Sequence, residues 1–153
     1  MPPFLFSLFP FFLVMALSLT RAVVFRATHR LMQPDLSEAE NRARYGWTAE
    51  APGHEHDYTC AVTVSGSPDP ATGALLDLAL LDRVLAQEVI GPLDGQYLND
   101  VVPPFAEGHA LATCEALAQW LYPRIAARIP EGLRLERVRI AEDPTLHADC
   151  TGP

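Results

Sequence analysis

The chain has 153 residues, of which 49% are hydrophobic, so it has the size and the apolar content of one domain with a core. Its net charge is −8, and its eleven basic residues are all arginines scattered along the sequence, which argues against nucleic acid as the main partner. The three cysteines are an odd number without a CxxC pair, which favours reduced thiols in a cytoplasmic protein over a disulfide framework.

The first nineteen residues, MPPFLFSLFPFFLVMALSL, form an apolar leader without any charge. The leader is too short for a comfortable membrane span, which needs about 20 apolar residues, so a membrane location is not expected. A secretory signal carries positive charge ahead of its apolar stretch, whereas the first arginine here is Arg21. We expect translation to start at Met15; the alternative is a start at Met1 with residues 1–22 acting as an export signal.

A single domain is expected over residues 20–153. Residues 20–31, TRAVVFRATHRL, mix β-branched, aromatic and polar side chains in rough alternation and predict a strand. The polar stretch 33–53 predicts a loop, with a helical turn in SEAENRAR. Residues 56–66, HDYTCAVTVSG, predict a second strand that pairs with the first across this long loop.

Two helices are expected next. Apolar residues recur at helical spacing over 75–91, and a Gly-Pro pair supplies the stop signal. A second helix is predicted over 113–129, with Thr113 as its N-cap and Pro123 as a point where it bends.

The last element, residues 133–143, alternates like a strand, with a phase slip at Glu136-Arg137 that predicts a bulge. The element order is therefore β, β, α, α, β. That order predicts an α+β domain in which an antiparallel sheet is covered on one face by helices.

Two of the five histidines, His54 and His56, stand one residue apart at the start of the second strand. Side chains at positions i and i+2 of a strand point to the same face, so both imidazoles could bind one metal ion. His29, from the neighbouring strand, could add a third nitrogen and leave the fourth tetrahedral position open, as in catalytic zinc sites. The alternative interpretation is a solvated start of a strand beside a surface histidine, because an H-x-H pattern alone is common.

Several segments resemble, in the same order, the family of 6-pyruvoyltetrahydropterin synthases and 6-carboxytetrahydropterin synthases. They span residues 25–143 and read FRATHRL, NRARYGWTAEAPGHEHDY, YTCAVTVSG, TGALLDL, LDGQYLND, TCEALA and RIAED. The resemblance implies a T-fold, an antiparallel β-sheet with two helices packed on one face that assembles into a multimeric barrel, usually a hexamer of two trimers. It also implies Zn2+ held by His29, His54 and His56.

The substrate implied by the resemblance is a pterin triphosphate, 7,8-dihydroneopterin triphosphate. In the family, zinc binds its side-chain hydroxyls, a cysteine base moves protons, and triphosphate is eliminated. The 6-carboxytetrahydropterin synthases also release acetaldehyde, on the route to 7-deazaguanine compounds such as queuosine.

The sequence departs from the family at its catalytic groups. The place of the family cysteine falls at Thr48 or at Glu50, and only the Glu50 carboxylate could take over as base; the alternative is that Glu50 is an exposed loop acid. The family motif LDHxxLN reads LDGQYLN here, so Asp94 matches the catalytic aspartate while Gly95 replaces its histidine neighbour. His109 could enter the site from a loop, although a lone loop histidine is more typical of the surface.

The residues that match the family's pterin-binding groups are retained better than those that match its catalytic groups. Glu142 matches the family glutamate that anchors the amino and ring N–H groups of the pterin, and Thr113-Cys114-Glu115 is similar to the family Thr-Thr-Glu. The alternatives are a surface acid for Glu142 and a simple helix cap for Thr113 and Glu115.

Three hypotheses follow. The first is a zinc-dependent lyase of the 6-carboxytetrahydropterin synthase type, working through a glutamate base or with altered chemistry. The second is a repurposed T-fold protein that binds zinc and pterin without turnover, and the third is an aldolase or epimerase acting on a related dihydropterin. Because neighbouring subunits usually build this family's pocket together, a homo-oligomer, trimer or hexamer, is expected.

Overall fold

The computed structural model of the protein describes residues 17–153. The bulk of the expected leader, residues 1–16, and the choice between Met1 and Met15 lie outside this range. None of the helices in the described range is both long and apolar enough to cross a membrane.

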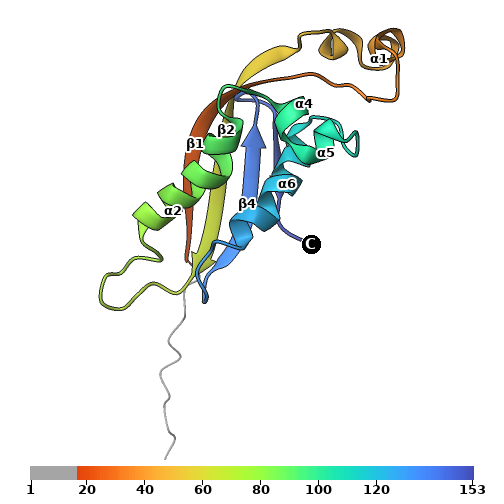
Figure 1. The fold of residues 1–153 in the computed structure, drawn as a ribbon. Coiled ribbons are helices and arrows are strands. Elements are labelled where there is room, and N and C mark those ends of the chain that lie inside the picture. The colour runs from red at the N-terminus through yellow and green to blue at the C-terminus, as the bar shows by residue number, and fades with distance from the viewer. Residues whose placement is uncertain (1–16) are drawn as a thin grey trace, which may run out of the picture.

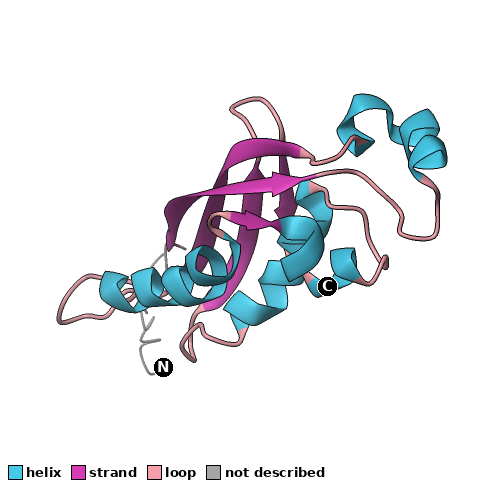
Figure 2. Cartoon of the chain, turned by 45° about the horizontal axis from the view of Figure 1, so that its top comes forward, coloured by secondary structure: helices cyan, strands magenta, loops and turns pink. Residues whose placement is uncertain are grey.

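A five-stranded sheet forms the centre of the domain, with strand order β3-β1-β2-β4-β5 (Figure 2). Its strands are β1 (Leu17–His29), β2 (His54–Gly66), β3 (Gln96–Tyr97), β4 (Arg134–Ala141) and β5 (His147–Cys150). The three long strands match the three that the sequence predicts, although β1 starts at Leu17, ahead of residue 20.

The strands β1 and β2 pair in antiparallel fashion over their whole lengths, from Leu17 opposite Gly66 to His29 opposite His54. The strand β4 pairs antiparallel with β2 and carries the predicted bulge. Thr63 lies opposite Arg137 and Val64 opposite Leu135, so Glu136 is the extra residue. The bulge explains the phase slip in the alternating sequence.

The two edge strands were not predicted from the sequence. The strand β5 pairs antiparallel with β4, whereas β3 pairs in parallel with β1 at Ala27 and Thr28. The expectation of a purely antiparallel sheet is therefore wrong at this one pair. A two-residue strand that follows a helix is too short to leave a period-two pattern in the sequence.

The helical segments are α1 (Glu38–Tyr45), the 3₁₀ turn η1 (Gly46–Ala49), α2 (Leu78–Leu85), the π turn η2 (Ala86–Ile90), α3 (Gly91–Leu93), α4 (Leu98–Val101), α5 (Pro103–Ala106) and α6 (Cys114–Ala126). The helices α2 and α6 cover one face of the sheet, while α1 lies beyond the end of the sheet on the long β1–β2 connection (Figure 1). This arrangement confirms the predicted α+β class.

The expected helical turn in the β1–β2 connection is a complete helix. Ser37 and Glu40 form a capping box in which each side chain bonds the backbone N–H of the other residue. The predicted helix over 75–91, by contrast, divides into α2, η2 and α3. Pro92 lacks the N–H that a regular helix would bond to the carbonyl of Glu88, and the π turn widens the helix at this point.

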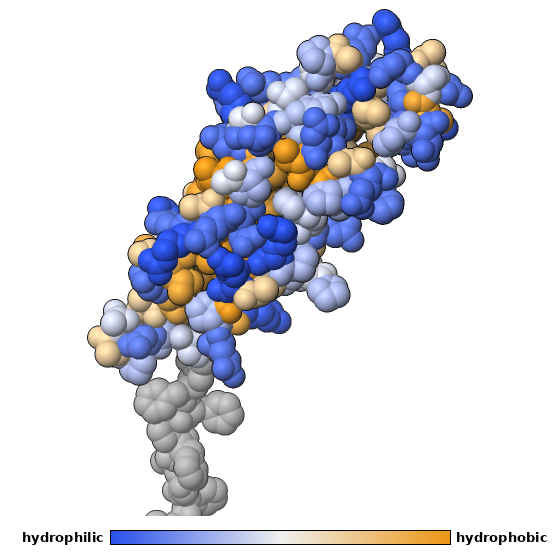
Figure 3. All heavy atoms as spheres, in the orientation of Figure 1, coloured by the Kyte–Doolittle hydropathy of each residue, from blue (hydrophilic) through white to orange (hydrophobic). Residues whose placement is uncertain are grey.

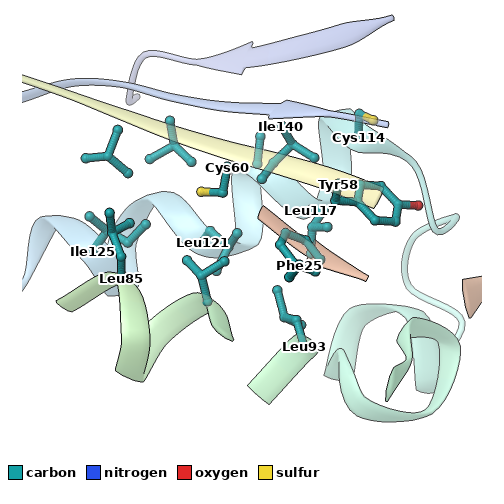
Figure 4. Close-up of a cluster of buried hydrophobic side chains, with 14 of the residues drawn as sticks. Phe25, Tyr58, Cys60, Leu85, Leu93, Cys114, Leu117, Leu121, Ile125 and Ile140 are labelled. Atoms are coloured by element: carbon teal, nitrogen blue, oxygen red, sulfur yellow. The ribbon is translucent and has the colours of Figure 1, made fainter. Parts of the chain in front are cut away.

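The core lies between the sheet and the helices α2 and α6 (Figure 4). On β1 the buried side chains alternate through Phe25, Ala27 and His29, and Phe25 stacks on Tyr58 of β2 with ring centroids 5.2 Å apart. The surface on the helical side is mostly hydrophilic, with small hydrophobic areas between the helices (Figure 3). The apolar face of β1 and β2 thus continues directly into the three histidines at its end.

Candidate metal centre

The pairing of β1 with β2 assembles the histidine cluster. His29 is the last residue of β1 and lies opposite His54, the first residue of β2, while His56 follows on the same face. One ring nitrogen of each residue lies within 4.8 Å of the corresponding nitrogens of the other two. The structure therefore brings together the three residues that the sequence singled out as metal ligands.

The loop before α6 fixes the orientation of His29. Its Nδ1 lies 2.6 Å from the carbonyl oxygen of Ala112, and because a carbonyl can only accept, Nδ1 carries the proton. The lone pair is then on Nε2. Hydrogen bonding of the second ring nitrogen is how metal-binding histidines are commonly oriented.

The nitrogens that remain indicate a metal ion. Within residues 17–153, the Nε2 atoms of His29 and His56 are buried and have no hydrogen-bond partner. An unsatisfied buried nitrogen costs about 1–3 kcal/mol, so two of them side by side call for a bound group. Burial also lowers the pKa of His29 and of His54, which favours the neutral imidazole that binds metals. The donor set fits a divalent cation that prefers imidazole ligands, such as zinc.

A pocket of about 230 Å³ opens beside the cluster. Its walls come from the ends of β1 and β4, the start of β2, the turn η1, the start of α6 and the turn that leads into β5. Glu142, directly after β4, lines this pocket, and its Oε2 lies 4.0 Å from Nε2 of His29. The recognition residue expected from the sequence therefore stands beside the metal ligands.

The start of α6 contributes the other two expected residues. Thr113 caps the helix, since its Oγ1 accepts a hydrogen bond of 3.3 Å from the N–H of Ala116, and it lines the pocket as well. Glu115, in the first turn, also lines the pocket. The cap interpretation and the pocket interpretation of Thr113 therefore both hold.

Two residues could occupy the place of the family cysteine, Thr48 and Glu50. They lie in different surroundings. Thr48 lines the pocket, held there by a bond from the N–H of Leu31 to its carbonyl. Glu50 lies outside the pocket and pairs with Arg42 at 3.1 Å, with 46% of its side chain exposed. Within one chain, the carboxylate is not at the metal centre.

Asp94 is also placed away from the cluster. Its Oδ1 accepts a hydrogen bond of 2.8 Å from the backbone N–H of Arg26. The residues that follow Glu50 and Asp94, Ala51-Pro52 and Gly95-Gln96, line one hollow beside β3. The two expected catalytic residues thus lie on neighbouring segments, at a different place from the histidines.

Sequence reasoning missed three contacts of the site. They are the carbonyl of Ala112, the thiol of Cys114 beside Glu142, and the ring of Tyr58, which packs edge-on against His29 and His56. Tyr58 could have been found, because it continues the i, i+2 series of His54 and His56. The other two depend on how α6 docks, which no local pattern specifies.

The fold and the site together define a T-fold protein with a candidate metal centre of three histidines beside an acidic pocket. A family model described as 6-pyruvoyl tetrahydropterin synthase matches residues 18–153. The chain belongs to this family.

Similar proteins agree with this membership. The human 6-pyruvoyl tetrahydrobiopterin synthase is 35% identical over 123 residues, which cover 80% of this chain and 83% of the human protein. The enzyme of the same name from Poecilia reticulata is 37% identical over 124 residues, covering 81% and 82%.

Solved structures confirm the expected T-fold. The Caenorhabditis elegans 6-pyruvoyl tetrahydropterin synthase superposes with a TM-score of 0.80 at 27% identity, covering 92% of this chain and 98% of that one. A Plasmodium vivax 6-pyruvoyltetrahydropterin synthase, in which a catalytic glutamate is replaced by cysteine, has a TM-score of 0.60 at 12% identity, covering 89% and 97%. The similarity to the latter concerns the fold alone.

Proposed function

We propose that the protein is a zinc-dependent lyase that acts on 7,8-dihydroneopterin triphosphate. The observation that carries this proposal is the pocket that holds His29, His54 and the carboxylate of Glu142 together, beside the cluster that His56 completes. A carboxylate suits two parallel N–H donors, such as the amino and ring N–H groups of a pterin. The membership of the family supports the same substrate class.

Each residue of the proposed site has its own role. His29, His54 and His56 would hold zinc, which supplies Lewis-acid polarisation of the substrate's hydroxyl groups when bound. Glu142 anchors the pterin ring, and Thr113 and Glu115 line the pocket at the start of α6. Because the pocket is small and partly lined by apolar side chains, it also excludes much of the water around the ring.

The proton transfers need a base, and we assign that role to Glu50, assisted by Asp94. Both lie outside the pocket of their own chain, so they would serve the pocket of a neighbouring subunit. A threonine hydroxyl, as at Thr48, is far too weak an acid to supply the anionic form at neutral pH.

Assembly into a trimer or a hexamer is part of the proposal. Within residues 17–153, the edge of β1 that faces away from β2 is paired only at Ala27 and Thr28, so most of its backbone groups are free for another strand. Light scattering tests the assembly, and a monomer at micromolar concentration would contradict it.

The product has two candidates. The names of the relatives favour 6-pyruvoyl tetrahydropterin, whereas the 6-carboxytetrahydropterin of queuosine synthesis requires the additional loss of acetaldehyde. A cytoplasmic location fits either product and is supported by the free thiols of Cys60, Cys114 and Cys150.

A second candidate function is a binding protein without turnover. The observation that favours it is the presence of Thr48 in the pocket and of Gly95 beside Asp94. A threonine hydroxyl is too weak an acid to act as the base at neutral pH, and glycine has no side chain to relay a proton. An aldolase or epimerase acting on a related dihydropterin would use the same recognition residues.

The deciding experiment starts the chain at Met15, loads it with zinc and follows 7,8-dihydroneopterin triphosphate by mass spectrometry. We expect loss of triphosphate and formation of the pyruvoyl product. Formation of the carboxy product would assign the queuosine-type reaction. Tight binding of unchanged substrate would establish the binding protein, and conversion of dihydroneopterin itself would establish the aldolase or epimerase.

A further inference from the structure

Cys114 has no role in the proposed reaction, although its thiol lies inside the pocket. It is the first residue of α6 and is only 5% exposed. Its Sγ lies 3.7 Å from Oε2 of Glu142, within hydrogen-bonding distance for sulfur. In the close-up of the core, Cys114 lies at the same end of the cluster as Tyr58 (Figure 4).

A thiol in this pocket could replace the missing cysteine base, but its surroundings argue against that role. Burial, together with the charge of Glu142, raises the pKa of the Cys114 thiol to about 12, and the carboxylate of Glu115 acts in the same direction. The sulfur therefore keeps its proton at neutral pH and acts as a donor.

Glu142 needs such a donor. It follows the last residue of β4, and its backbone is held by a bond from its N–H to the carbonyl of Leu146. Within residues 17–153, the thiol of Cys114 is the one hydrogen-bond donor to its side chain, because Nε2 of His29 carries the lone pair and lies 4.0 Å away. Without that bond the carboxylate is free to rotate about its side-chain torsions.

We propose that Cys114 is a positioning residue, whose S–H donates to Oε2 of Glu142 and holds the carboxylate in the orientation that accepts two parallel N–H groups of a pterin. The inference rests on the proposed function and adds to it the group that aims the recognition carboxylate. A carboxylate oxygen has two lone-pair directions, so Oε2 can accept from the thiol and from the ligand together.

The test compares two probes on the zinc-loaded protein, 7,8-dihydroneopterin and its lumazine counterpart, which has a carbonyl in place of the 2-amino group. The lumazine lacks one of the two donors that Glu142 would bind, so the ratio of the two dissociation constants reports how well the carboxylate is aimed. We expect Cys114→Ala to weaken binding of the pterin by about 10-fold, or ~1.4 kcal/mol, and binding of the lumazine by less than about 2-fold.

Cys114→Ser keeps a donor and should retain the pterin affinity within about 3-fold. Cys150→Ala, which removes a thiol of β5 outside the pocket, is the matched control. In a Glu142→Ala background, Cys114→Ala should add no further loss, because there is no carboxylate left to orient.

Equal weakening of both probes, or a serine variant as poor as the alanine variant, would show that Cys114 only fills space. Unchanged pterin affinity in Cys114→Ala would likewise overturn the inference, while the proposed function would stand. If the wild-type protein failed to discriminate the pterin from the lumazine, both the inference and the assigned role of Glu142 would be wrong.

Discussion

His29 connects the histidine cluster to the rest of the molecule through its two ring nitrogens. Nδ1 bonds the carbonyl of Ala112, just before α6, and Nε2 faces the other two histidines. The docking of α6 and the orientation of a metal ligand are thus one event. The ring of His54, in contrast, is flanked by the exposed Trp47, with centroids 4.9 Å apart.

Replacing His54 by alanine should remove one of three metal ligands and lower zinc affinity by more than about 100-fold, while the fold is kept because His54 is only half-buried. Zinc content after gel filtration, measured by atomic emission, checks this. His109→Ala is the control, because His109 is exposed and pairs with Glu107, away from the histidine cluster. Stoichiometric zinc in the His54 variant would contradict the assigned ligand set.

Glu50→Gln should abolish formation of product and leave the zinc content unchanged, since the amide cannot accept a proton and Glu50 does not touch the histidines. Thr48→Ala, which removes a hydroxyl that donates to the carbonyl of Tyr45, should keep most of the activity. Single-turnover kinetics measure both variants. Full activity of the glutamine variant would assign the base elsewhere.

At the scale of residues, a period of two places His54 and His56 on one face of a strand, and strand pairing brings His29 next to them. Glu142 was predicted from the family resemblance alone. The sequence could not place Glu50, because a loop residue has no periodicity. The structure shows Thr48 in the pocket and Glu50 outside it, a difference that depends on the shape of η1.

At the scale of elements, the return of the long connection into β2 is the tightest point of the site. Gly53 has a φ of +101°, and a Cβ added there would lie 2.6 Å from the carbonyl oxygen of His29. Only glycine combines this conformation with this close approach of the two strands. The pairing of His29 with His54 across the two strands therefore depends on Gly53.

Gly53→Ala should lower the free energy of unfolding by at least about 2 kcal/mol and weaken metal binding as well, because the clash forces β1 and β2 apart between two ligands. Gly73→Ala, at a φ of +72° with open space around it, should cost only about 1 kcal/mol and leave the metal affinity unchanged. Urea denaturation and zinc titration measure the two effects. Equal effects of both variants would argue against the close approach.

The edge strand β5 is attached to β4 partly by Asp149, which accepts bonds of 2.7 and 2.8 Å from Arg139. These bonds hold the pKa of Asp149 below its usual 3.8. A carboxylate with a lowered native pKa stabilises the fold above its unfolded pKa, and the contribution disappears as the pH falls through the native pKa.

Asp149→Asn should therefore lower the free energy of unfolding at pH 7 by about 0.5–1 kcal/mol, a modest value because the pair is about one third exposed. The difference from the wild type should shrink below pH 3.8 and vanish in stronger acid. Denaturation curves at several pH values check this, with the exposed Asp35→Asn as control. A difference that grew in acid would contradict the sign.

The long strands, the bulge in β4 and the cap of α6 could all be predicted from the sequence, because each leaves a local signature. The strands β3 and β5 could not, since they are short and owe their existence to neighbours that are distant in the chain. The interruption of the first predicted helix at η2 could not be predicted either, because an apolar repeat does not distinguish an α turn from a π turn.

For the whole molecule, metal binding should contribute to stability, because the folded state alone holds the three histidines together. With zinc at about 100 times its dissociation constant, the gain is about 2.7 kcal/mol, which raises the melting temperature by about 5–10 °C. Differential scanning fluorimetry with and without a chelator measures it. An unchanged melting temperature in the presence of zinc would contradict a specific site.

The three histidines all belong to one hairpin, within 28 residues of the chain from His29 to His56. The cost in chain entropy of closing a loop grows only slowly with its length, so even the long β1–β2 connection allows these contacts to form early in folding. The hairpin can therefore bring the three histidines near one another before the segment that carries Glu142 folds, while the final orientation of His29 follows when α6 docks and Ala112 accepts its hydrogen bond. Zinc should accordingly speed refolding as well as slow unfolding, which would make the candidate site part of the folding nucleus.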